Sequence, residues 1–343
     1  MKLSYEQLVS VTSGAVEFHD LEEGFCAYHF TAQQRNAYQI RSEVFNDSFY
    51  AKSCGSSGIT LRFRTNSPWL KLAVHIKSAS SRQYFSVDVT ADGKLVGSVD
   101  NFEMPAFGTN FTTMQAPMGD FAGEFSLGEG EKTVCVYLPW SVICTITALE
   151  LADGASLVPV KYPKKLLAFG DSITHGYDAL RPTNKYITQV AEALGMEEFN
   201  KAIGGEVFWP ELAQMEDPFT PDLITVAYGT NDWRLLDYEV IKQTCESFFQ
   251  NLRKTYPNVP VVAITPIWRA DHSLAHKPFS LFPLISQIIR DTVDKIGNAY
   301  VVEGWELVPQ DTNLYADLRL HPNDEGFVHY AKNLLAAMPN EVK

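Results

Sequence analysis

Three polar side chains in the second half of the chain have the chemistry of a nucleophile, an oxyanion donor and a base. Ser172 follows an apolar run at residues 166–169. Asn231 follows a second apolar run at residues 223–228, and His321 lies near the carboxyl terminus. A serine hydroxyl is a weak nucleophile until a base such as imidazole removes its proton, and N–H groups then stabilise the charge that develops on the attacked carbonyl oxygen. Taken singly, each signal is weak, because Gly-Asp-Ser is a common turn, an Asn-Asp pair is more often a helix cap and a lone His-Pro is more often structural.

The second half of the chain alternates strand and helix signals, which could bring these residues together. We expect strands near residues 166–169, 198–200, 223–228, 259–265 and 300–302, and helices at residues 186–194, 238–256 and 284–296. This βαβ series predicts a parallel sheet with helices on both faces and right-handed crossovers. Open sheets of this kind bind ligands at the carboxyl ends of their strands, where the polar residues lie.

The first half of the chain has the period-two alternation of short antiparallel strands. From about residue 30 to 160 we expect a β pattern, with strands at residues 59–64, 70–77, 84–89, 94–99, 132–138 and 142–151 and no strong helical segment between them. This pattern predicts a β-sandwich or jelly roll over residues 1–155, followed by a second domain over residues 164–343. Trp69 and Trp140 could stack on sugars, but core packing is the more common role of a sandwich tryptophan. We therefore favour a bracing role for this half over a sugar-binding role.

Composition excludes several classes of partner. The 343 residues carry a net charge of −13, which disfavours nucleic acid because phosphate binding needs clustered Lys and Arg. The sequence has no apolar run long enough to cross a membrane, and the first residues lack the apolar core of a signal peptide, so a cytoplasmic location is expected unless a leader was removed. The cysteines are odd in number and scattered, which predicts free thiols: Cys26, Cys54, Cys135, Cys144 and Cys245.

Four segments in the second half resemble the conserved blocks of the SGNH, or GDSL, hydrolase family, and they occur in the family's order. They are residues 169–173 (Phe-Gly-Asp-Ser-Ile), 200–205 (Asn-Lys-Ala-Ile-Gly-Gly), 228–232 (Tyr-Gly-Thr-Asn-Asp) and 321–323 (His-Pro-Asn). The resemblance covers about residue 164 to the end and implies a flavodoxin-like domain. It also implies that Ser172 is the nucleophile and His321 the base, with an oxyanion hole formed by the N–H groups of Ser172 and Gly205 and the Asn231 side chain.

The acidic partner of the histidine departs from the family pattern. The family has its acid three positions before the histidine, where this chain has Leu318, and Asp317 lies one position earlier. A one-residue bulge could let Asp317 reach the His321 ring. Alternatively, a backbone carbonyl could orient the ring and leave a Ser–His dyad. We favour Asp317 as the partner.

A metal site has weaker support in the sequence. His272 and His276 are four residues apart, a spacing that could bind a metal ion on a helix. The HExxH arrangement is missing, and Pro278 indicates a loop. We therefore predict no metal and no cofactor.

Aromatic residues after the strand ends suggest a carbohydrate substrate. Trp209, Trp233 and Trp268 follow three predicted strands and Arg269 is adjacent, so they could form a rim around the serine, although at least one tryptophan is expected to pack under a loop. The order of a sandwich and then an SGNH domain also resembles the two-domain carbohydrate esterases of family two, some of which use a dyad.

The leading hypothesis is a serine esterase that removes small acyl groups, acetyl above all, from an oligosaccharide or glycoside. The alternatives are a lipase or thioesterase for longer acyl chains and a carbohydrate-binding protein with a silent hydrolase domain. Acyl transfer to another sugar uses the same intermediate. The sequence does not indicate an oligomeric state.

Overall fold

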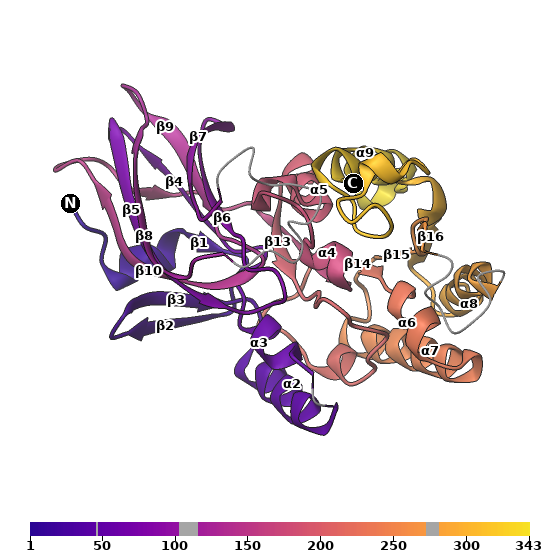
Figure 1. Cartoon of the computed structure of the whole chain (residues 1–343). Helices are drawn as coiled ribbons and strands as arrows, with labels where there is room; N and C mark the ends of the chain where they lie inside the picture. Colours follow the sequence, from indigo (N-terminus) through magenta and orange to yellow (C-terminus); the bar gives the residue numbers. More distant parts are fainter. Residues whose placement is uncertain (46, 103–115, 272–280) are drawn as a thin grey trace. The chain divides into compact units, whose positions relative to one another are not determined.

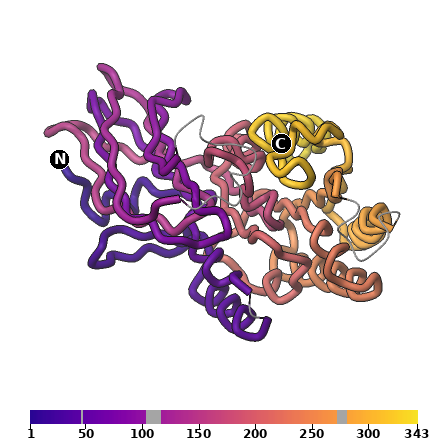
Figure 2. Tube along the Cα trace, viewed as in Figure 1, coloured from indigo at the N-terminus to yellow at the C-terminus, as the bar shows by residue number. Residues whose placement is uncertain are grey.

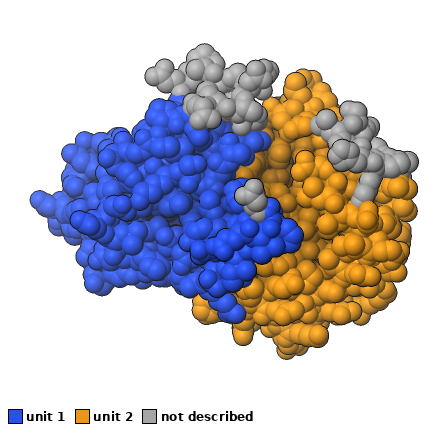
Figure 3. All heavy atoms as spheres, turned by 60° about the horizontal axis from the view of Figure 1, so that its bottom comes forward, with its two compact units in different colours: residues 1–163, 180–183, 197–199 blue, residues 164–179, 184–196, 200–343 orange. Residues whose placement is uncertain are grey.

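The structure, a computed structural model, describes residues 1–45, 47–102, 116–271 and 281–343. It comprises two units, coloured separately in Figure 3: residues 1–163, 180–183 and 197–199 form unit 1, and residues 164–179, 184–196 and 200–343 form unit 2. The path of the chain can be followed by colour in Figure 2. None of the helices within the described residues has the length and apolar character needed to span a bilayer.

Unit 1 contains two antiparallel sheets (Figure 1). The strands of the first sheet are, in spatial order, β1 (Thr12–Ser13), β4 (Thr60–Thr65), β9 (Lys132–Tyr137), β6 (Ser86–Ala91) and β7 (Lys94–Asp100), with β11 (Val158–Pro159) paired to β4. Those of the second are β2 (Glu17–Leu21), β3 (Gly24–Tyr28), β10 (Val142–Leu151), β5 (Trp69–Ser78) and β8 (Gly119–Ser126). Short strands with period-two alternation thus form the expected antiparallel architecture.

The core of unit 1 lies between these two sheets. Leu61, Phe63 and Val136 come from the first sheet, and Val74 and Ile146 come from the second; all belong to one buried apolar cluster. In β4 the residues between the buried ones, such as the two arginines of Thr60–Thr65, are turned away from the core. Trp140 is also buried and packs edge-on against Tyr84, with ring centroids 5.8 Å apart, as expected for a core tryptophan.

The β pattern expected from about residue 30 is wrong for residues 32–53, most of which are helical. Unit 1 contains α1 (Tyr5–Val11), α2 (Ala32–Phe45) and α3 (Phe49–Ser53). Only Gln34 and Tyr38 of α2 are buried, so this 14-residue helix has no continuous apolar stripe. A helix that is polar on most of its surface lacks the periodic signal by which helices are recognised in sequence.

Unit 2 is built around a five-stranded sheet with the order β13 (Met196–Asn200), β12 (Lys164–Gly170), β14 (Leu223–Ala227), β15 (Val261–Ile264) and β16 (Ala299–Val302). Strands β12, β14, β15 and β16 run parallel, and Gly170 at the end of β12 pairs with Ala227 at the end of β14. The order is that of flavodoxin-like sheets. The expected α/β domain with a central parallel sheet is therefore confirmed.

Helices cover both faces of this sheet (Figure 1). Leu166 and Ala168 of β12 face a core shared with α5 (Tyr186–Leu194) and α9 (Asp324–Ala337). Phe169 faces the opposite side, where its ring lies 5.6 Å from that of Phe248 in α7 (Tyr238–Thr255), which packs beside α8 (Pro283–Val293). The remaining helices are α4 (Ser172–His175), α6 (Thr230–Leu235) and the 3₁₀ turns η2 (Pro182–Asn184), η3 (Leu212–Gln214), η5 (Gly304–Glu306), η6 (Thr312–Leu314) and η7 (Asn340–Val342).

Candidate active site

A sharp turn from strand to helix places Ser172 at the carboxyl edge of the sheet. β12 ends at Gly170, and Asp171 caps α4, where its Oδ1 accepts a hydrogen bond of 3.0 Å from the Ile173 N–H. A Cβ atom on Gly170 would lie 2.3 Å from the Thr174 Oγ1, so only glycine lets the helix approach the strand this closely. Ser172 is the first residue of α4.

Ser172, His321 and Asp317 form a continuous chain of hydrogen bonds. The Ser172 Oγ lies 2.8 Å from the His321 Nε2, and the His321 Nδ1 lies 2.8 Å from the Asp317 Oδ2. An ionised carboxylate can only accept, so Nδ1 carries a hydrogen and the Nε2 of a neutral ring accepts from the serine hydroxyl. This is the tautomer that a general base requires. The structure thus brings together the three residues that the sequence assigns to the nucleophile, base and acid.

The loop before His321 accommodates the extra residue in the motif. Leu318 has a φ of +58°, a left-handed conformation that costs a side-chain-bearing residue roughly 1–2 kcal/mol. The Asp317 Oδ1 offsets this cost by accepting from the N–H groups of Arg319, Leu320 and His321 at 2.8–3.1 Å. Asp317 therefore holds the loop with one oxygen and the imidazole with the other.

The electrostatic surroundings of Asp317 favour its ionised form. Burial by itself raises the pKa of this carboxyl, but hydrogen bonding and charge from His321, together with the N–H groups of Leu320 and His321, outweigh burial and lower the pKa far below its ordinary value. Asp317 therefore remains an acceptor for Nδ1 at neutral pH.

The predicted oxyanion donors lie on the two neighbouring strand-end loops. Gly205 has a φ of +91°, a conformation that favours glycine. The Asn231 Nδ2 donates to the carbonyl oxygen of Glu206 over 3.0 Å, so the amide is fixed beside the residue that follows Gly205. An amide nitrogen carries two hydrogens, and the second can be directed at a substrate oxyanion.

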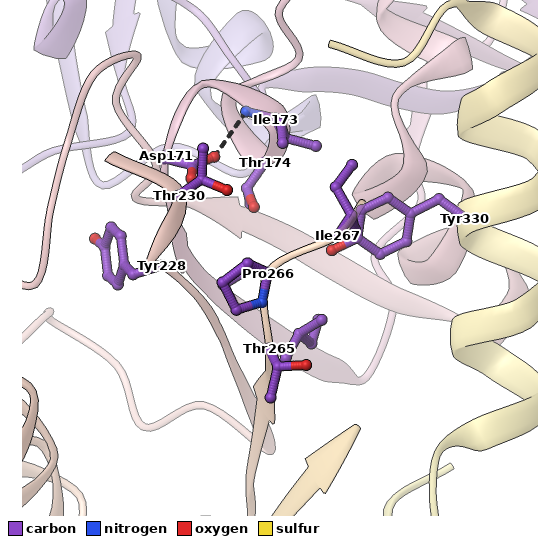
Figure 4. A pocket seen from close by; sticks show the side chains of 11 residues that line it. Asp171, Ile173, Thr174, Tyr228, Thr230, Thr265, Pro266, Ile267 and Tyr330 are labelled. Atoms are coloured by element: carbon purple, nitrogen blue, oxygen red, sulfur yellow. Dashed lines mark hydrogen bonds between the residues drawn. The ribbon is translucent and has the colours of Figure 1, made fainter. Parts of the chain in front are cut away.

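A small cavity shows that the nucleophile turn and the Asn231 turn are neighbours. Asp171 and Thr230, the residues that immediately precede Ser172 and Asn231, both line it, and Figure 4 shows their side chains close together. Its volume of about 10 Å³ is enough for about one water molecule. Ser172 and Asn231 are thus presented from adjacent turns.

Two buried carboxyls lie beneath these turns. Burial raises the pKa of Asp171 to about 6, although the Ile173 N–H opposes the change. Burial likewise raises the pKa of Asp232 to about 7, against hydrogen bonds from the N–H groups of Phe208 and Gly229. These carboxyls brace the turns that carry Ser172 and Asn231.

The loop that carries Gly205 is also fixed by aromatic packing. A Cβ atom on Gly204 would lie 2.5 Å from the Tyr177 ring, whose centroid is 5.8 Å from that of His321. The Gly204 N–H donates to the His175 Nδ1 over 3.1 Å. His175 thus helps to fix the loop that carries Gly205.

The expected substrate rim is incorrect for Trp233 and Arg269. Both are 2% exposed. The Arg269 guanidinium lies 5.0 Å from the Trp233 ring centroid and forms an ion pair with Asp271. The Phe282 ring packs edge-on against the Trp233 ring, with centroids 5.1 Å apart. A buried guanidinium needs such partners, so this cluster supports the loops from within.

The other two tryptophans are partly exposed. Trp209 follows the Gly205 loop, and Trp268 packs edge-on against Tyr315 with ring centroids 5.4 Å apart. A role of Trp209 and Trp268 in contacting a sugar stays a prediction. The possible metal ligands His272 and His276 lie outside the described residues. All five cysteines are buried free thiols.

Sequence reasoning did not single out Asp178. Its side chain is fully buried, and its Oδ2 lies 3.4 Å from the His321 Nδ1. Asp178 belongs to none of the four motif blocks, and its spacing of six residues from Ser172 gave the one hint that it could lie near the site.

Comparison with known families identifies the class of the second unit. Residues 168–327 match the GDSL-like lipase/acylhydrolase family. This segment contains the nucleophile turn, both predicted oxyanion loops and the histidine. Over these residues the chain is therefore similar to the GDSL-like lipase/acylhydrolase family. No curated protein is a significant match to the sequence.

Several solved structures share the fold along nearly the whole chain. A candidate GDSL-like lipase from Bacteroides ovatus is 17% identical with a TM-score of 0.77, covering 100% of this chain and 97% of that one. A salicylyl-acyltransferase from a tetracycline biosynthetic pathway is 20% identical with a TM-score of 0.75, covering 95% and 93%. A family two carbohydrate esterase from Clostridium thermocellum, in complex with cellohexaose, is 14% identical with a TM-score of 0.64, covering 84% and 94%.

Proposed function

We propose that the protein is a serine esterase that hydrolyses small acyl esters, acetyl above all, on carbohydrates. The observation that carries the proposal is the contact of 2.8 Å between the Ser172 Oγ and the His321 Nε2. The match of residues 168–327 to the GDSL-like lipase/acylhydrolase family supports acyl chemistry. The similarity in fold to the carbohydrate esterase in complex with cellohexaose, and to an acetyl xylan esterase from Butyrivibrio proteoclasticus, supports a sugar ester as substrate.

The proposed reaction proceeds in two steps through a covalent intermediate. His321 takes the Ser172 proton while Oγ attacks the ester carbonyl, and the resulting oxyanion accepts hydrogen bonds from the N–H groups of Ser172 and Gly205 and from Asn231. Collapse expels the sugar hydroxyl, which receives the proton from His321, and leaves an acyl group on Ser172. Water, deprotonated by His321, then attacks this ester and releases the carboxylic acid.

The acyl-enzyme can also be intercepted by an alcohol instead of water. The similarity in fold to the salicylyl-acyltransferase supports this second candidate, acyl transfer to an acceptor hydroxyl. Hydrolysis and transfer share every residue named above and differ in what reaches the acyl carbonyl. Whether hydrolysis or acyl transfer predominates therefore depends on the acceptor and not on the nucleophile.

Nitrophenyl esters of increasing acyl length test the proposal. We expect the largest kcat/KM for acetate, with Ser172→Ala as the inactive control. A preference for octanoate would favour a lipase or thioesterase, and no hydrolysis would favour a carbohydrate-binding protein with a silent hydrolase domain. Acetate release from acetylated oligosaccharides, repeated with an excess of free sugar, then separates hydrolysis from transfer, because transfer yields a newly acetylated sugar in place of acetate.

A further inference from the structure

A second buried carboxylate faces the ring nitrogen that Asp317 binds. The Asp178 Oδ2 lies 3.4 Å from the His321 Nδ1, and the Asp317 Oδ2 lies 2.8 Å from the same atom. The three side chains have their nearest polar atoms within 4.8 Å of one another. The exposed fraction of the Asp178 side chain is 0% and that of Asp317 is 8%, so water screens neither charge well.

The fold holds Asp178 in this place through the turn that follows the nucleophile helix. α4 ends at His175 and is capped by Gly176, whose φ is +117°, and the Tyr177 N–H donates to the Ser172 carbonyl oxygen over 2.9 Å. Asp178 itself has a φ of +72°, which only a few residue types adopt readily, Asp and Asn among them. The same turn therefore ties the position of Asp178 to that of the serine.

We propose that Asp178 is a second positioning residue for His321, one that shares the Nδ1 hydrogen with Asp317 and stabilises the imidazolium formed during catalysis. This inference rests on the proposed function of Ser172 and His321. At 3.4 Å the contact is longer than a good hydrogen bond, so Asp317 is the main acceptor and Asp178 acts chiefly through its charge. The proposal requires that the ring turn toward Asp178 when Asp317 is missing.

Asp317 and Asp178 are held in place by different parts of the chain. Asp317 uses one oxygen for three backbone N–H groups of its own loop, so its position depends on a loop that contains a strained Leu318. Asp178 comes from the other side of the site, on the serine's own turn. Two carboxylates from separate loops therefore hold one ring, which compensates for the unusual spacing of Asp317 and His321.

A double-mutant cycle tests the proposal. Asp178→Asn keeps the shape and the tolerance for positive φ but removes the charge, and Asp291→Asn on the exposed surface of α8 is the matched control. We expect Asp178→Asn to lower kcat about fivefold with KM unchanged, and Asp317→Ala to lower it about 100-fold. The kcat of the double variant should fall about tenfold further than the product of the two single losses predicts, because residues that act on one group are coupled.

Additive losses, or an effect of Asp178→Asn no larger than that of Asp291→Asn, would overturn the proposal. If Asp317→Ala disorders its loop, Asp317→Asn replaces it, since the amide oxygen can still accept from the three backbone N–H groups. The same non-additivity is expected with that variant.

Proton NMR gives a readout that does not depend on turnover. In a Ser172→Ala background, the low-field signal of the His321 Nδ1 hydrogen should persist in Asp317→Ala and disappear only when Asp178→Ala, which leaves no acceptor at that position, is added. Loss of the signal in Asp317→Ala alone would contradict a role for Asp178. Failure of the proposed function would instead appear as undiminished hydrolysis by Ser172→Ala, whatever the NMR result.

Discussion

The two units differ in where their polar side chains lie relative to their strands. In β4 of unit 1, Leu61 and Phe63 are buried while Arg62 and Arg64 point away from the core. In β14 of unit 2 nearly every residue is buried, because helices cover both faces of the parallel sheet. Polar groups in unit 2 therefore gather where the strands end, and those are the residues of the candidate site.

This difference teaches that chemistry and stability are separable in the molecule. A sandwich strand distributes its polar residues along an outer face, where no two strands are forced to present them at one point. A covered parallel sheet has a single edge at which its loops converge. Substitutions at this edge should affect turnover, and substitutions in the sandwich core should affect stability.

The largest expected effect is that of His321→Ala on turnover. Removing the base leaves Ser172 protonated, so kcat should fall by about four to six orders of magnitude. Thermal unfolding should change far less than turnover, because the imidazole lies at the carboxyl edge of the sheet, where it binds Ser172 and Asp317. Steady-state kinetics with nitrophenyl acetate and a melting curve on the same sample provide the measurement. A loss of less than tenfold would remove His321 from the mechanism.

Leu61→Ala should have the opposite effect to His321→Ala: it should lower stability and leave turnover unchanged. The side chain is fully buried in the sandwich core, so its truncation should lower the free energy of unfolding of unit 1 by about 2–5 kcal/mol. Urea denaturation followed by circular dichroism measures this loss, and kcat/KM at 25 °C should match the wild type. A large fall in kcat/KM of the folded variant would mean that the sandwich contributes directly to the site.

Asn231→Ala should reduce turnover less than His321→Ala. One oxyanion donor typically contributes about 10²–10³ in kcat, and this is the expected loss. KM should change little, because the donor acts on charge that develops only in the transition state. A rise in KM of about 10²–10³, with kcat unchanged, would instead assign Asn231 to binding of the ground-state substrate.

The smallest effect is expected for Asp171→Asn, which changes the pH dependence of stability. The folded-state pKa of Asp171 is raised to about 6 from 3.8, so its contribution to stability is fully present below about pH 3.8 and is lost as pH rises through about 6. Asn caps a helix as well as Asp and keeps the bond to the Ile173 N–H, but it does not ionise.

The free energy of unfolding should therefore fall less between pH 4 and 7 in this variant than in the wild type, by about 1–3 kcal/mol. Urea denaturation at several pH values measures the difference. Parallel curves for the two proteins would show that Asp171 titrates normally in the fold.

Much of the fold was predictable because its signals are local. The helix expected at residues 186–194 is α5 with the same bounds, and the five strands expected in the second half lie within a few residues of β12 to β16. Continuous apolar runs and 3.6-residue periodicity can be read from the sequence without knowledge of the tertiary contacts. The polar helix α2 was missed because a helix with two buried side chains has no such period.

The site was predictable where a motif fixes the backbone and not where packing decides. Ser172, Gly205, Asn231 and His321 stand at turns whose residue types follow from their conformation and chemistry. Whether Asp317 could reach the imidazole depended on the φ of Leu318, which no local pattern specifies.

Burial of particular side chains depended on contacts distant in sequence. Trp233 is enclosed by Arg269 and Phe282, and neither partner could be inferred from the spacing of the tryptophans. Asp178 reaches His321 from 143 positions away in the chain, so its proximity is a result of the tertiary fold alone.

The central claim is that the Ser172 hydroxyl, activated by His321, carries the acyl group. The most direct measurement is acid quenching of the enzyme during turnover of nitrophenyl acetate, followed by mass spectrometry of its peptides. One acetyl group on Ser172, absent from the His321→Ala protein, is the predicted result. Acetylation at another residue, or full turnover with Ser172 unmodified, would contradict it.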